Sequence, residues 1–94
     1  MVDQNELIGT WKIEVPSGAY GDVAMSFDKG GGLRYSTHEN DKEQIIILSY
    51  RLEGEVLVTD QPSAPRQERT RVVIEGDRMT LDYNGKISTY RRLL

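Results

Sequence analysis

Apolar and polar residues alternate with a period of two along most of the chain, which is the pattern of half-buried β-strands. The alternation starts at Thr10, where Trp11 and Ile13 share one face and Lys12 lies on the other. It predicts eight short strands, at approximately residues 10–15, 22–28, 33–38, 44–52, 56–59, 69–74, 79–83 and 86–92. The alternation leaves open which residues of 56–59 and 86–92 face inward.

Short connections rich in turn residues separate these segments. Asn84-Gly85 is the strongest hairpin signal, and the run Gly30-Gly31-Gly32 can supply the backbone angles of another tight turn. Asp3 and Glu6 have the spacing of a capping box, which predicts a helical turn that ends near Gly9. No later segment has a helical period. The chain is therefore predicted to be all-β, an eight-stranded antiparallel up-and-down barrel with a short N-terminal helical turn.

A meander of eight strands closes into a barrel because an open sheet exposes two unpaired edges. The interior of such a barrel is just wide enough for side chains or one small ligand. The inward positions include tyrosines and adaptable apolar side chains, which predict a ligand-binding wall or, equally, a filled core. The candidate ligand-binding residues are Tyr35, Tyr50, Tyr83, Met25, Phe27 and Met79.

Ile45 and Ile47 are the strongest candidates for apolar side chains on the outside of the barrel. They alternate with Ile46 and Leu48, so one of the two pairs must face outward in a regular strand. An exposed apolar patch commonly marks a partner surface, which suggests a homodimer through Ile45 and Ile47. Alternatively, a bulge near Gln44 rotates part of this run inward.

Composition narrows the possible functions. The 94 residues make one domain spanning 1–94, with a net charge of -3, no basic block and no cysteine. Nucleic acid is therefore not expected as a partner, and disulfides and thiolate chemistry are excluded. No apolar stretch approaches the ~20 residues that a membrane-spanning helix needs. The N-terminus has no export signal, so we expect a cytoplasmic protein, or an exported one if a leader has been removed.

The sequence gives little indication of catalysis or of metal binding. His38 is the only histidine, and its position near a turn beside Glu39 and Asp41 favours a solvated residue over a metal ligand or proton carrier. No serine stands in a Gly-x-Ser-x-Gly context. The glycine run is not followed by the lysine and helix of a phosphate-binding loop. We therefore expect no enzyme activity, no metal and no cofactor.

Gly9-Thr10-Trp11 at the start of the first strand resembles the Gly-x-Trp signature of the calycin superfamily, which includes the lipocalins. The segment from Tyr50 to Leu57 also resembles the mid-barrel hairpin of small bacterial lipocalin-like proteins. The resemblance implies that an arginine on the last strand lies over the indole and closes one end of the barrel. Arg92 is the preferred match because Tyr90 on the same face is a good core residue, although Ile87 favours Arg91 instead.

The leading expectation is a non-enzymatic protein that binds a small apolar or amphipathic molecule in the barrel, from the end opposite Trp11 and Arg92. The alternative is a protein-interaction or inhibitor module with a filled core.

Overall fold

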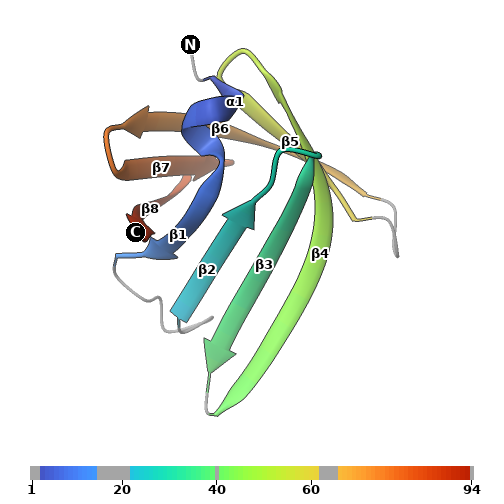
Figure 1. The fold of residues 1–94 in the computed structure, drawn as a ribbon, viewed down its shortest axis with the longest axis vertical. Coiled ribbons are helices and arrows are strands. Elements are labelled where there is room, and N and C mark those ends of the chain that lie inside the picture. The colour runs from blue at the N-terminus through green and yellow to red at the C-terminus, as the bar shows by residue number, and fades with distance from the viewer. Residues whose placement is uncertain (1–2, 15–21, 40, 62–65, 94) are drawn as a thin grey trace.

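The computed structural model describes residues 3–14, 22–39, 41–61 and 66–93. Within these ranges one short helix precedes eight strands that form a closed antiparallel barrel in sequence order (Figure 1). The predicted fold class is thus confirmed. The elements are α1 (Gln4–Leu7), β1 (Gly9–Ile13), β2 (Asp22–Phe27), β3 (Gly32–Glu39), β4 (Lys42–Glu53), β5 (Val56–Asp60), β6 (Gln67–Glu75), β7 (Arg78–Tyr83) and β8 (Lys86–Leu93).

The first and last strands close the barrel. Trp11 of β1 pairs with Arg92 of β8, and Ile13 pairs with Tyr90. On the outer surface of this seam, Glu14 forms ion pairs with Arg78 (2.9 Å) and Arg91 (3.6 Å). Closure matters because it pairs the two edges that a meander would otherwise leave exposed.

The predicted capping box is present at α1. The Asp3 side chain accepts a hydrogen bond from the Asn5 amide (3.0 Å), and the Glu6 carboxylate accepts one from the Asp3 amide (3.1 Å). The helix ends earlier than predicted, at Leu7 rather than near Gly9, because Ile8 has an extended backbone and Gly9 already belongs to β1.

The two predicted hairpin turns are also confirmed. Asn84 and Gly85 both have positive φ (51° and 86°), as a two-residue hairpin of this kind requires. In the glycine turn, the Asp28 carboxylate accepts hydrogen bonds from the Gly30 and Gly32 amides, both at 2.8 Å. Val15, the last residue of the first predicted strand, lies outside the described residues.

Strand β4 is longer than predicted and has no bulge near Gln44. Its pairing with β3 is continuous from Gly32 opposite Ser49 to Glu39 opposite Lys42. The bulge alternative is therefore wrong, and Ile45 and Ile47 face outward with 43% and 60% of their surface exposed.

The two strand phases left open are now settled. On β5, Leu57 joins the core, whereas Val58 faces outward and is nevertheless only 1% exposed. Its neighbours across the sheet are Arg51 and Arg69, which Glu53 links by ion pairs of 2.8 Å and 3.2 Å, so this cluster covers Val58. On β8, Tyr90 is buried.

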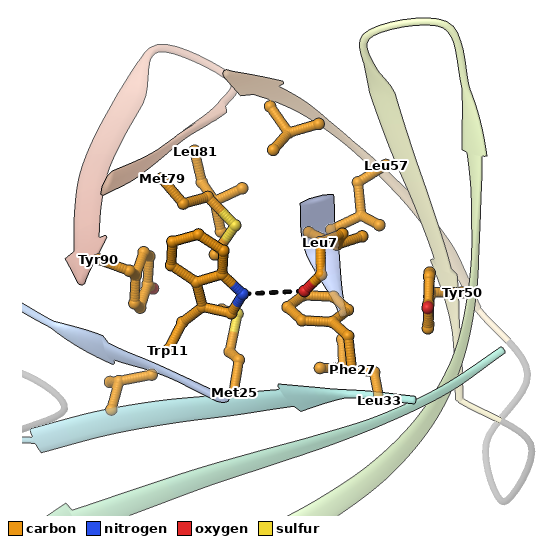
Figure 2. Packing of buried hydrophobic residues seen from close by; sticks show 12 residues of the cluster. Leu7, Trp11, Met25, Phe27, Leu33, Tyr50, Leu57, Met79, Leu81 and Tyr90 are labelled. Carbon is orange, nitrogen blue, oxygen red and sulfur yellow. Dashed lines mark hydrogen bonds between the residues drawn. The ribbon is translucent and has the colours of Figure 1, made fainter. Parts of the chain in front are cut away.

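The core gathers at the end of the barrel where α1 lies. In an antiparallel meander alternate turns share an end, so the β2–β3, β4–β5 and β6–β7 turns accompany α1; we call this end the floor and the opposite one the far end. The side chains that meet near the floor are buried (Figure 2). They include Leu7, Trp11, Met25, Phe27, Leu33, Tyr50, Leu57, Val72, Met79, Leu81 and Tyr90.

Candidate functional site

The floor of the barrel is sealed around Trp11. The indole is fully buried, and its Nε1 donates a hydrogen bond to the Leu7 carbonyl at 2.9 Å (Figure 2). The Arg92 guanidinium lies 4.3 Å from the centre of the indole ring. It also donates to the carbonyls of Ile8 (2.9 Å) and Glu6, so one arginine satisfies the end of α1 and covers the indole at once.

The backbone at Gly9 requires the glycine of the Gly9-Thr10-Trp11 motif. Its φ of +130° is one that side chains rarely adopt, and a Cβ there would lie 3.1 Å from Nη1 of Arg92. Glycine at position 9 therefore lets the chain pass from α1 into β1 close to the Arg92 guanidinium.

Arg92, rather than Arg91, occupies the inward position, as the sequence analysis preferred. Arg91 points outward to Glu14. Ile87, which favoured the opposite phase, is 69% exposed, so that part of the reasoning was wrong. Tyr90, also assigned to barrel closure, is 4% exposed, and burial raises the pKa of its hydroxyl, with a partly offsetting hydrogen bond from Ser88.

Four of the six predicted ligand-binding residues belong to the packed floor. Met79 is fully buried, and Met25, Phe27 and Tyr50 are at most 7% exposed. Phe27 and Tyr50 meet edge to face with ring centres 5.1 Å apart, and the Tyr50 hydroxyl donates to the Asp28 carbonyl at 2.6 Å. These side chains support the structure and present little free surface to a ligand.

Tyr35 and Tyr83 are the two predicted residues that keep solvent exposure. Both face the interior but are only half-buried, and they come from β3 and β7, which are not neighbours in the sheet. The structure therefore does not bring the six predicted residues together into one accessible wall.

Glu68 is an interior residue that the sequence analysis missed. It faces inward from β6, where it pairs with Thr59, and its carboxylate accepts a hydrogen bond from the Tyr83 hydroxyl. This bond, with burial, raises the pKa of Tyr83. Arg66 forms an ion pair with the same carboxylate at 2.8 Å. Extending the alternation of residues 70, 72 and 74 backward by two positions would have found Glu68.

The solvent exposure of the inward side chains changes from strand to strand across the sheet. One row of paired residues runs from Trp11 through Met25 and Tyr35 to Ile46. Trp11 is 0% and Met25 7% exposed, whereas Tyr35 and Ile46 are half-buried. The interior thus has a closed floor, and solvent reaches several inward side chains nearer the far end, whereas Val23 near the far end of β2 stays buried at 3% exposure.

Polar groups are concentrated in the far-end part of the interior. Its half-buried side chains carry hydroxyls and one carboxylate, and they include Thr37, Thr59, Glu68, Thr70, Tyr83 and Ser88. Such a lining can hydrogen-bond a ligand, while Ile13 and Ile46 on the neighbouring strands supply apolar contacts.

His38 lies on the outer face of β3, exposed, with Asp22 and Glu43 opposite it on the flanking strands. In the described ranges, no group of three His, Asp or Glu side chains is arranged to hold a metal ion. No helix in the same ranges has the length and apolar character that a bilayer crossing requires.

Comparison with known proteins identified no matching family model, curated protein or solved structure. The resemblance to the calycin superfamily therefore stays a prediction, and function is inferred from the geometry.

Proposed function

We propose that this chain is a calycin-like, non-enzymatic binding protein that takes a small amphipathic molecule in the far-end part of its barrel. The observation that carries the proposal is the rise in exposure along the inward row, from 0% at Trp11 to half-buried at Tyr35 and Ile46. Small-molecule sites typically combine an apolar wall with a few convergent polar groups, which matches the lining at this end.

We assign separate roles to the two ends of the barrel. Trp11, Leu7 and Arg92 fix the shape of the floor, and their contacts are satisfied within the chain. Ligand contacts are left to the far end, with Glu68 and Tyr83 as the polar partners and Tyr35 as an aromatic wall. This arrangement favours an amphipathic ligand over a purely apolar one, because the lining places a carboxylate and hydroxyls beside apolar side chains.

The proposal is tested by native mass spectrometry of the protein as purified from cells, with a matched pair of variants. Ser88 and Thr89 are adjacent on β8 and both half-buried, but Ser88 faces the interior and Thr89 the outside. Ser88→Trp should abolish a co-purified adduct and Thr89→Trp should retain it, with both variants folded by circular dichroism. A clean apo mass from several expression hosts, or equal adducts in both variants, would contradict interior binding.

A second candidate function is association with a protein partner, foremost a second copy, through Ile45 and Ile47. The specific observation is that both side chains are exposed on a regular strand. Light scattering over a concentration series should then show a dimer that Ile47→Glu removes. Ile87→Glu is the control, because Ile87 is 69% exposed on another strand. A monomer at all concentrations would exclude the homodimer.

A further inference from the structure

A groove of about 600 Å³ lies on the outer surface of the barrel, at the floor end of β1 to β4. Its lining includes small residues, namely Gly9, Gly32 and the cross-strand pair of Thr10 and Ser26. Larger apolar residues also line it, among them Ile8 and Ile47. Its volume falls in the range of small-molecule sites.

The groove is largely apolar, although two hydroxyl groups line it. Thr10 Oγ1 and Ser26 Oγ hydrogen-bond to each other at 2.9 Å, so they satisfy one another. Ile47 is 60% exposed, and a ligand lying across it would remove that apolar surface from water.

Positive charge is available at the groove. Lys29 and Arg34 line it, and within the described residues neither forms an ion pair. Asp28 also lines it, but its carboxylate already accepts the amides of Gly30 and Gly32. Two cations and one engaged carboxylate leave a net charge of about +1, which complements a monoanion.

We infer that this groove binds an amphipathic monoanion, an aliphatic carboxylate whose chain lies against Ile8 and Ile47 and whose head pairs with Lys29 and Arg34. The site lies outside the barrel and does not depend on ligand binding in the interior.

The test is a titration of the full chain, labelled with ¹⁵N, with octanoate, 1-octanol and octyltrimethylammonium, which share a chain and differ in head-group charge. Octanoate should shift the amides of Gly9, Ser26, Gly32 and Ile47 saturably and at lower concentration than the other two probes. Replacing both cations (Lys29→Gln with Arg34→Gln) should weaken octanoate binding about fivefold, since each exposed ion pair contributes little.

Arg71→Gln is the matched control, because Arg71 is an exposed strand arginine that also lacks an ion pair in the described ranges. It should leave octanoate binding unchanged. The inference is overturned if the three probes bind equally, if Arg71→Gln weakens binding as much as the double variant, or if the groove amides do not shift. Shifts confined to Thr70, Tyr83 and Ser88 would overturn it while supporting interior binding. Groove shifts that depend on protein concentration alone would assign the surface to a second copy.

Discussion

At the scale of single residues, Arg92 joins the two ends of the chain, since its guanidinium lies 4.3 Å from the centre of the Trp11 ring and donates to the Ile8 and Glu6 carbonyls. A glycine two positions before a tryptophan, and an arginine near the other end, carry a recognisable local pattern. Tyr50 was assigned to ligand contact only because it faces inward. Its hydroxyl partner, the Asp28 carbonyl, comes from a different hairpin, and strand alternation contains no information on such contacts.

Trp11 should be far more important for stability than His38. Trp11→Ala removes a fully buried ring and should lower the free energy of unfolding by about 3 kcal/mol or more. His38→Ala removes an exposed side chain and should change it by less than about 0.5 kcal/mol. Chemical denaturation of both variants measures these values, and the reverse order would mean that the core is misplaced.

Tyr83 should titrate above the ordinary tyrosine pKa of about 10, because its hydroxyl donates to the Glu68 carboxylate. A pKa raised on folding means that the associated stability is present below pH of about 10 and is lost as the pH rises through the folded value. Glu68→Gln should bring the Tyr83 pKa back toward the ordinary value in an NMR titration. Glu75→Gln, on an exposed residue of the same strand, should not; a similar fall in both variants would refute the assigned cause.

At the scale of elements, the alternation and the turn residues predicted where the strands lie and, for most strands, which side chains face inward. The β5 phase could not be predicted, because Val56, Leu57 and Val58 are all apolar. Val58 is buried on the outside, beneath arginines from β4 and β6 that only the three-dimensional pairing brings together. The end of α1 was also misjudged, since a capping box marks where a helix begins and not where it ends.

The Asn84-Gly85 turn should be sensitive to a single methyl group. Gly85 has φ of +86° with open space where a Cβ would lie, so Gly85→Ala changes backbone strain alone. We expect a loss of roughly 1 kcal/mol in the free energy of unfolding. Gly30→Ala is the control, because Gly30 is not at positive φ and its Cβ would make ordinary contacts. Equal effects of the two substitutions on thermal unfolding would argue against this backbone requirement.

At the scale of the whole molecule, closure was predictable and the difference between the two ends was not. Unpaired edges made closure the expected outcome for eight strands. Which inward side chains keep solvent exposure depends on strand tilt and on α1 covering the floor, and neither is encoded in a period of two. Glu68, Thr70 and Ser88 share an interior region for that reason, although they are spread over two strands and a long stretch of sequence.

The central claim is that ligand enters the far-end part of the interior and not its packed floor. The most direct measurement is of intermolecular nuclear Overhauser effects between a saturating neutral amphiphile, 1-octanol, and the assigned methyl groups. The account predicts contacts with Ile13, Ile46 and Thr70, and none with the fully buried Leu7 and Val72. Contacts confined to the outward-facing Ile45 and Ile47, or no contacts at saturation, would contradict it.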